Sequence, residues 1–352
     1  MEIFEKIREY GHEQVVFWND PSAGYRGIIA IHDTTLGPAL GGTRFWDYRS
    51  EAEAIVDVLR LSRGMTSKAA AAGLNLGGGK SVIMGDPKTR NREMIFRAHG
   101  RFVDSLKGRY ITAEDVGTSV EDMDFVQMET EYVSGVAGGL GDPSPVTAYG
   151  TYRGIKACAK EKYGNDSLSG LRIAVQGLGH VGYHLCSHLS AEKARLVVTD
   201  IDEVRIRRAV ADFGAEAVSV NEIYAVDAQI FAPCALGAVV SDDTLPRFGF
   251  EIIAGAANNQ LAEERHGDEL EKRGILYAPD YVINAGGLIN VYGELEGWSA
   301  ERARRKAGEI YATLLGLFEL AREQGIPTYE AADRFAERRI EQLARLKKTW
   351  LR

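Results

Sequence analysis

The segment Gly170-Leu-Arg-Ile-Ala-Val-Gln-Gly-Leu-Gly-His-Val-Gly182 decides the fold of the second half of this chain. A strand-like stretch, residues 172–176, runs directly into Gly-x-Gly-x-x-Gly, which opens an apolar helix. The first glycine permits a tight turn, the second lets the backbone approach a pyrophosphate, and the third lets helix and strand pack closely. The N-terminus of the helix favours an anion. The pattern predicts a dinucleotide site formed by Gly177, Leu178, Gly179, His180, Val181 and Gly182.

An acidic residue follows this turn at the distance that a dinucleotide fold requires. Asp200 ends the predicted strand 195–199, 18 residues after Gly182. Its carboxylate can accept hydrogen bonds from both ribose hydroxyls and repels a 2′-phosphate, which favours NAD over NADP. The alternative is a glycine-rich turn in some other α/β protein, and the flanking strands together with the acid disfavour it.

Strand and helix patterns alternate regularly after residue 145. Strands are predicted at residues 172–176, 195–199, 215–218, 229–232 and 251–254, and helices at 145–162, 180–189 and 203–213. Apolar strands separated by helices indicate a doubly wound parallel sheet with helices on both faces. We therefore predict a Rossmann domain over residues 145–327.

The Gly/Pro-rich loop 137–145 separates this domain from an N-terminal α/β domain, residues 1–144. Strands are predicted there at residues 27–32 and 109–113, and a helix is predicted from Ser50, which forms a capping-box pattern with Glu53. The charged helical pattern that begins at Trp298 continues to the C-terminus, and we expect the helix 328–352 to pack back on the first domain. The active-site cleft is expected between the two domains.

Composition excludes several classes of protein. Hydrophobic residues make up 45% and charged residues 26% of the chain, and the net charge of −8 argues against nucleic acid as a partner. The chain shows no secretory signal and no run of about 18 apolar residues, so no membrane contact is expected. Three cysteines without a C-x-x-C pair favour a reduced, cytoplasmic protein.

Three histidines at helical spacing raise the possibility of a metal site. His180, His184 and His188 recur every four residues. His180 lies inside the phosphate turn, and no carboxylate or thiolate complements the row. We therefore predict no metal.

The segment Gly73-Leu-Asn-Leu-Gly-Gly-Gly-Lys80-Ser81 looks like a phosphate-binding P-loop, but its first glycine is one place too early and no apolar strand precedes it. A substrate site is the alternative. Lys68 lies twelve residues before Lys80, and two cations in one desolvated pocket would leave one of them neutral, so one could bind a carboxylate and the other act as a base. Asp115 follows a predicted strand and precedes a turn. Taken singly, the lysines could be surface residues and Asp115 a cap, and spacing alone does not bring the three together.

At this point the sequence resembles the glutamate/leucine/phenylalanine/valine dehydrogenase family, and most closely its leucine-oxidising branch. The resemblance covers nearly the whole chain in the family's order, at residues 35–44, 73–80, 110–117, 142–147, 231–237, 254–260 and 278–287. It implies NAD-dependent oxidative deamination of an apolar amino acid, in a homo-oligomer with an octamer among its arrangements. It also makes the first domain the substrate-binding and oligomerisation domain.

The resemblance implies a role for each candidate residue of the first domain. Lys68 would pair with the substrate α-carboxylate, aided by backbone N–H groups near Gly42 and Gly78. Lys80 would be the low-pKa lysine that activates water, and Asp115 would shuttle the proton.

It implies cofactor and specificity roles as well. Thr147 would reach the nicotinamide carboxamide, and Asn258 would orient the nicotinamide ribose. Glutamate enzymes carry a lysine where this chain has Leu40, so a side-chain carboxylate would be left buried and unpaired here. The remaining side-chain pocket consists of Ala113, Leu288 and Val291.

Leucine is the favoured substrate, with valine and isoleucine as co-substrates. Leu288 departs from the valine that leucine enzymes tend to carry, which keeps phenylalanine or another apolar amino acid open. Two other classes were considered. A hydroxy-acid dehydrogenase would need a His–carboxylate pair that is not found here, and a non-catalytic Rossmann binding subunit would have no reason to keep Lys68, Lys80 and Asp115.

Overall fold

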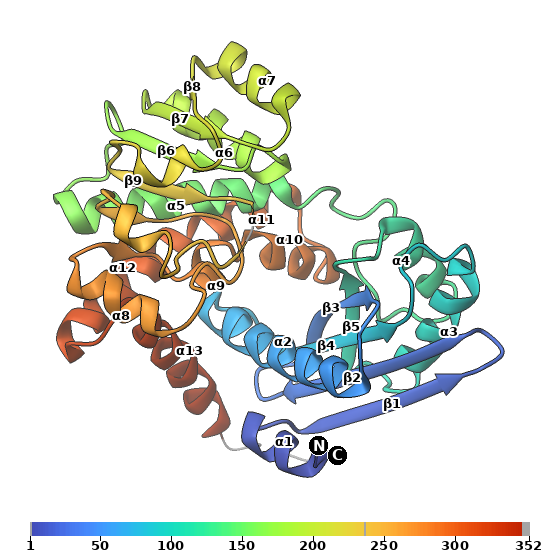
Figure 1. Ribbon diagram of the computed structural model, residues 1–352. Coiled ribbons are helices and arrows are strands. Elements are labelled where there is room, and N and C mark those ends of the chain that lie inside the picture. The colour runs from blue at the N-terminus through green and yellow to red at the C-terminus, as the bar shows by residue number, and fades with distance from the viewer. Residues whose placement is uncertain (1, 236, 347–352) are drawn as a thin grey trace. The chain divides into compact units, whose positions relative to one another are not determined.

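The computed structural model describes residues 2–235 and 237–346 (Figure 1). The chain forms two compact units. The first contains residues up to Gly141 together with Glu294–Gly297 and the segment that begins at Ala336, and the second contains Asp142–Gly293 and Trp298–Phe335. Each unit is described by itself below.

The first unit is built on a mixed five-stranded sheet in the order β1-β2-β4-β3-β5. β2 is antiparallel to both β1 and β4, whereas β3 is parallel to β4 and β5. The strands are β1 (Gln14–Asp20), β2 (Tyr25–Asp33), β3 (Ala39–Trp46), β4 (Gly77–Met84) and β5 (Tyr110–Glu114). Only β2 and β5 correspond to predicted strands.

Helices cover both faces of this sheet. Ile28 and Ala30 of β2 pack in one core with α2 (Glu51–Ala71), whereas Ile29 and Ile31 pack in another with α3 (Arg92–Asp104). Because side chains alternate along a strand, α2 and α3 lie on opposite faces. The shorter helices of the unit are α1 (Ile3–Tyr10) and α4 (Val120–Gln127).

The predicted start of α2 is confirmed, with one difference in its cap. Ser50 is the N-cap residue, and its hydroxyl accepts a hydrogen bond from the Glu53 backbone N–H. The Glu53 carboxylate accepts from the N–H of Arg49 at 2.9 Å, one residue before the partner that a capping box would use.

The second unit contains a six-stranded sheet whose described pairings are all parallel, in the order β11-β10-β9-β6-β7-β8. Strand order reverses at β6, as in a doubly wound dinucleotide fold. The strands are β6 (Arg172–Gln176), β7 (Arg195–Thr199), β8 (Glu216–Ala217), β9 (Ile230–Pro233), β10 (Ile252–Ile253) and β11 (Leu276–Tyr277). The predicted fold class is confirmed, although β11 was not predicted.

The helices of this unit include the three that were predicted before residue 214. These are α5 (Ser144–Tyr163), α6 (His180–Ala191) and α7 (Glu203–Phe213). α5 packs against α6 and α12. The others are α8 (Arg265–Lys272), α9 (Asp280–Ile283), α10 (Gly286–Leu295), α11 (Ala300–Gly308) and α12 (Ile310–Gln324), with short 3-10 turns at Glu222–Ala225 and Leu245–Arg247.

The last helix, α13 (Thr328–Ala344), begins in the second unit and ends in the first. Within the first unit, the Arg339 guanidinium donates hydrogen bonds to the carbonyl of Leu74 at 2.6 Å and to Oδ1 of Asn75 at 3.0 Å. The end of the predicted helix, residues 347–352, lies outside the described residues. Within the described part of the chain, every helix is too short or too polar to cross a membrane.

Candidate active site

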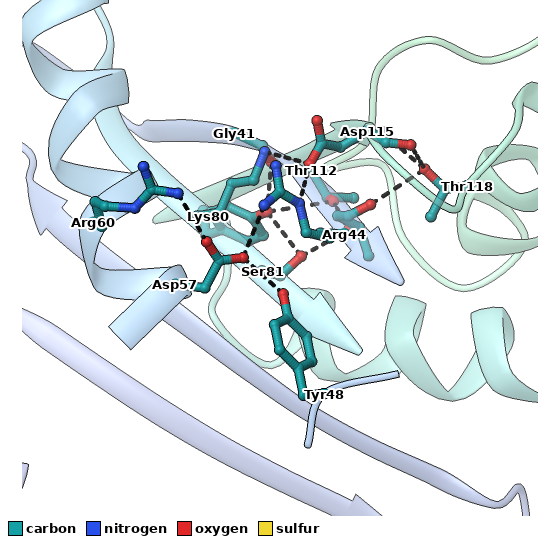
Figure 2. A network of polar contacts seen from close by, with 12 residues as sticks. Gly41, Arg44, Tyr48, Asp57, Arg60, Lys80, Ser81, Thr112, Asp115 and Thr118 are labelled. Atoms are coloured by element: carbon teal, nitrogen blue, oxygen red, sulfur yellow. Dashed lines mark hydrogen bonds and ion pairs between the residues drawn. The ribbon is translucent and has the colours of Figure 1, made fainter. Parts of the chain in front are cut away.

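Lys80 and Asp115 form a close ion pair in the first unit. Lys80 lies on β4, a strand that is buried throughout, and its side chain is only 7% exposed. Its Nζ is 2.9 Å from Oδ2 of Asp115 (Figure 2). Asp115 directly follows β5 and begins a turn, as predicted, in which its N–H donates to the Thr118 hydroxyl at 2.8 Å. Two candidates 35 residues apart in the sequence are therefore in contact.

The sheet register places the other candidates of this unit on the same face. Paired residues of neighbouring strands point to the same face of a sheet. Leu40 pairs with both Gly78 and Ile111, and Gly42 pairs with Ala113. Lys80 pairs with Ala30, which packs in one core with α2. Leu40, Gly42, Gly78, Lys80 and Ala113 consequently share the face that α2 covers, and the ion pair with Lys80 brings Asp115 to this face.

Two glycines allow the close contacts of this face. A Cβ on Gly42 would lie 2.8 Å from the Cβ of Asp115, and a Cβ on Gly78 would lie 2.1 Å from Oγ1 of Thr66 on α2. The glycine run at residues 77–79 is part of β4, a strand that the sequence analysis did not predict. Lys68 lies half-buried in the last turn of α2.

The ion pair of Lys80 and Asp115 is part of a larger network of ion pairs, whose other members were given no role in the sequence analysis. The Arg44 guanidinium lies between two carboxylates, with Nε 3.2 Å from Oδ2 of Asp115 and Nη1 2.9 Å from Oδ2 of Asp57 (Figure 2). The Tyr48 hydroxyl and Arg60 also contact Asp57, at 2.8 and 3.2 Å. Arg44 ends the segment 35–44 of the family resemblance, so that resemblance was a signal for it. Asp57 had no sequence signal.

Burial and the neighbouring charges shift the pKa values of Lys80 and Asp115. Burial lowers the pKa of Lys80 and is the largest influence on it, Arg44 lowers that pKa further, and Asp115 acts in the opposite direction. Burial alone would raise the pKa of Asp115, but Lys80 and Arg44 outweigh it and hold that pKa below its usual value. The prediction of a low-pKa lysine is therefore supported. Arg44 is a cation beside Lys80 to which the sequence analysis gave no role.

The predicted dinucleotide turn lies where β6 meets α6 in the second unit. Gly177 has φ +97°, which an L side chain rarely adopts, and a Cβ on Gly182 would lie 1.9 Å from the Gly177 carbonyl oxygen. α6 begins at His180 and its N-cap residue Gly179 provides no side-chain cap, so the first N–H groups are available to an anion. These residues fit a pyrophosphate.

Asp200 directly follows β7 and lies beside this turn. Its side chain is 6% exposed, and its two carboxylate oxygens accept hydrogen bonds from the N–H groups of Leu178 at 2.6 Å and of Asp202 at 2.9 Å. The carboxylate is thus held at the end of the strand next to the phosphate turn, as recognition of a ribose requires.

The remaining cofactor candidates belong to the same unit. The His180 ring lies 3.2 Å from an oxygen of Asp142, and Val181 is half-buried in the first turn of α6. Thr147 lies on α5, where its hydroxyl donates to the carbonyl of Pro143.

Asn258 is held by Asn284, which lies in the segment 278–287 of the family resemblance and was given no role there. Its Oδ1 accepts a hydrogen bond from Nδ2 of Asn284 at 2.7 Å. The buried Oδ1 of Asn284 finds no hydrogen-bond partner among the described residues.

Two candidate pocket residues lie on α10. Leu288 is buried, whereas Val291 is half-buried.

His188, the last of the three evenly spaced histidines, packs against an aromatic side chain. His188 stacks on Tyr152 with ring centroids 5.3 Å apart. Within residues 2–235 and 237–346, no three His, Cys, Asp or Glu side chains gather in a way that could hold a metal ion.

Comparisons with known proteins agree with this arrangement. Residues 12–132 match the Glu/Leu/Phe/Val dehydrogenase dimerisation domain, and residues 198–345 match the Glutamate/Leucine/Phenylalanine/Valine dehydrogenase family. The chain is 58% identical to a leucine dehydrogenase of Bacillus cereus and 59% identical to one of Thermoactinomyces intermedius, over 100% of this chain and 97% of each relative.

A solved structure is similar throughout. The crystal structure of L-tryptophan dehydrogenase from Nostoc punctiforme shares 49% identity with this chain, at a TM-score of 0.89 over 97% of this chain and 100% of that one. The resemblance proposed from the sequence is confirmed. The chain belongs to the glutamate/leucine/phenylalanine/valine dehydrogenase family, an NAD-dependent family of amino-acid dehydrogenases.

Proposed function

We propose that this protein catalyses the reversible NAD-dependent oxidative deamination of a branched-chain L-amino acid, with leucine preferred and valine and isoleucine as further substrates. The amino acid, NAD⁺ and water give the 2-oxo acid, ammonium, NADH and one proton. The observation that carries this proposal is the buried contact between Lys80 and Asp115, because it places an amine, whose pKa burial lowers, directly beside a carboxylate.

Each group of the first unit has a chemical role in this reaction. A bound NAD would supply the acceptor for the hydride of the substrate Cα. The neutral amine of Lys80 takes a proton from the water that attacks the resulting imino carbon, and Asp115 passes protons between Lys80, the amine and solvent. Lys68 binds the α-carboxylate, and the N–H groups near Gly42 and Gly78 assist it.

In the second unit, the turn at residues 177–182 would hold the pyrophosphate at the N-terminus of α6, and Asp200 would accept hydrogen bonds from the ribose hydroxyls. Thr147 and Asn258 would orient the nicotinamide end, and Asn284 would hold Asn258 in place. The amide–amide contact of 2.7 Å supports this last assignment.

Leucine is favoured over glutamate for a physical reason. Leu40 is 2% exposed, so a glutamate carboxylate at this position would lose its hydration without gaining a cation. The leucine dehydrogenases at 58–59% identity support the same substrate. A valine dehydrogenase at 48% identity and L-tryptophan dehydrogenases at 49–50% identity keep other apolar amino acids as the alternative.

Formation of NADH with leucine, valine, isoleucine, phenylalanine, tryptophan and glutamate tests this proposal. We expect the highest kcat/KM with leucine and the lowest with glutamate. Lys80→Ala should reduce kcat by about 10²–10⁴-fold while NAD binding, followed by fluorescence, is retained. A wild-type-like rate in Lys80→Ala would remove Lys80 from the mechanism, and a preference for an aromatic substrate would replace leucine.

We further propose that the protein is a cytoplasmic homo-oligomer. The match of residues 12–132 to a domain described as a dimerisation domain supports self-association. Sedimentation of the purified protein would give its stoichiometry, for which an octamer is the arrangement expected from the family resemblance.

A further inference from the structure

Lys80 and Asp115 belong to a row of alternating charges between the sheet and α2, and the reaction above gives no role to the other members of this row. The row runs from Lys80 through Asp115 and Arg44 to Asp57 and ends at Arg60 (Figure 2). The Lys80 side chain at one end is 7% exposed, the three side chains between are 15–24% exposed, and Arg60 at the other end is 53% exposed. The row therefore connects a buried amine to the surface.

A lysine paired with a buried carboxylate is a poor base. When such a lysine loses its proton, the carboxylate is left buried without a counter-ion, which is strongly unfavourable. Asp115 is not left without a counter-ion, because its Oδ2 lies 2.9 Å from Nζ of Lys80 and also 3.2 Å from Nε of Arg44. A guanidinium stays charged at every pH at which enzymes work. Asp115 thus keeps a cation whether or not Lys80 is protonated.

The geometry also fixes where the guanidinium lies. Nη1 of Arg44 is 2.9 Å from Asp57 on α2, and the Tyr48 hydroxyl donates to the same carboxylate oxygen at 2.8 Å. Arg60 holds the other oxygen of Asp57 at 3.2 Å. With Asp57 held from two sides, Arg44 remains directed toward Asp115.

We propose that Arg44, anchored by Asp57, is a positioning residue that keeps Asp115 paired and oriented when Lys80 gives up its proton. This inference rests on the proposed function, in which Lys80 is the base. It gives Arg44 on β3 and Asp57 on α2 a role in setting the pH at which Lys80 can act as a base.

The charges that face Lys80 give this role a distinctive signature. From β3 Arg44 lowers the pKa of Lys80, and from α2 Asp57 raises it, as does Asp115 from the turn after β5. Lys68 lies further along α2, and the Tyr48 and Tyr110 hydroxyls remain neutral because burial raises their pKa values. Removing the charge of Arg44 and removing that of Asp57 should therefore shift the titration of Lys80 in opposite directions.

The test is the pH dependence of kcat and kcat/KM for leucine oxidation in full-length variants. In Arg44→Met the acidic limb should move to higher pH by about one unit, with about a tenfold loss of kcat below the limb. In Asp57→Asn it should move to lower pH. Arg44→Lys keeps the charge but cannot contact both carboxylates at once, so it should restore part of the shift. The titration of the substrate itself is common to all variants and cancels in the comparison.

A matched control lies on the other face of the sheet. Arg97 on α3 also bridges two carboxylates, Glu129 at 2.7 Å and Glu93 at 3.5 Å. Arg97→Met should leave the limb in place, even if it lowers stability.

The outcomes separate the two proposals. If Arg44→Met folds and shows the wild-type limb, the role of Arg44 is refuted. If Lys80→Ala is as active as the wild type, the proposed function fails first. An inactive Lys80→Ala together with an unshifted Arg44→Met would overturn only the inference about Arg44.

Discussion

At the scale of single residues, Leu40 is the residue that we propose selects the substrate side chain. Its side chain is buried on β3, opposite Gly78, on the face that also carries Lys80 and Asp115. An apolar group at this position favours an apolar substrate side chain, because any charge brought there would be desolvated.

Leu40→Lys should shift the substrate preference from leucine toward glutamate. The new ammonium would pair with a glutamate side chain, so we expect the ratio of kcat/KM for glutamate to that for leucine to rise by at least tenfold, with leucine oxidation reduced. Leu40→Met, which keeps an apolar side chain of similar volume, is the control. An unchanged ratio in a folded Leu40→Lys protein would show that Leu40 does not contact the substrate side chain.

Reasoning from single residues of the sequence singled out the phosphate turn, Asp200, the two lysines and Asp115 as candidates, since their chemistry is distinctive. It could not reach the Arg44–Asp57 contact, which depends on β3 and α2 lying side by side. It also did not identify Arg44 as a cation that lowers the pKa of Lys80, because the distance between these side chains exists only in the folded sheet.

At the scale of elements, the two units differed in how well the sequence predicted them. β6, β7 and α7 have the predicted bounds, since each is an apolar run or an amphipathic period bounded by turn residues. β3 and β4 contain Gly41, Gly42 and the run Gly77–Gly79, and glycine-rich segments have no local preference for a strand. Neighbouring strands and α2 stabilise them as strands, and this is a property of the tertiary structure.

Replacement by alanine should destabilise the protein at Gly78 and stabilise it at Gly64. A Cβ on Gly78 would lie 2.1 Å from Oγ1 of Thr66 and 2.4 Å from the carbonyl oxygen of Ser62, so Gly78→Ala must push α2 away from β4. We expect it to lower the free energy of unfolding by about 1–3 kcal/mol. Gly64 lies on α2, and no atom lies within 4 Å of the position that its Cβ would take. Gly64→Ala should therefore raise the free energy of unfolding by about 0.5–1 kcal/mol.

Urea unfolding of the two variants and the wild type, with equal m-values, would measure both effects. A stable Gly78→Ala protein would mean that α2 does not rest on this strand as described.

For the whole molecule, buried histidines predict sensitivity to acid. His99 is fully buried and its pKa is lowered to about 3, and His12 is buried with a pKa lowered to about 4, in both cases chiefly by burial. Both rings are neutral in the folded chain but titrate near 6.5 when it unfolds. The unfolded state therefore binds more protons below pH 6.5, and acid favours it.

We expect the free energy of unfolding to fall as pH drops from 6.5 toward 4, by up to about 1.4 kcal/mol per pH unit for each histidine. Unfolding curves at several pH values for the wild type and for His99→Gln would measure this. The variant loses a contact with Tyr25 and should be less stable at pH 7, but its stability should fall less steeply with acid. An equal slope in both proteins would contradict the assignment.

The path of the chain through the two units has a consequence for its synthesis. The first unit contains the first 141 residues and also the segment that begins at Ala336, where Arg339 binds the carbonyl of Leu74. Translation at about 5–20 residues per second needs on the order of 10–40 s for the roughly 190 residues in between. During that interval the ribosome carries a first unit that lacks its final helix, so the loop that leads into the strand of Lys80 stays uncovered until the second unit has been made.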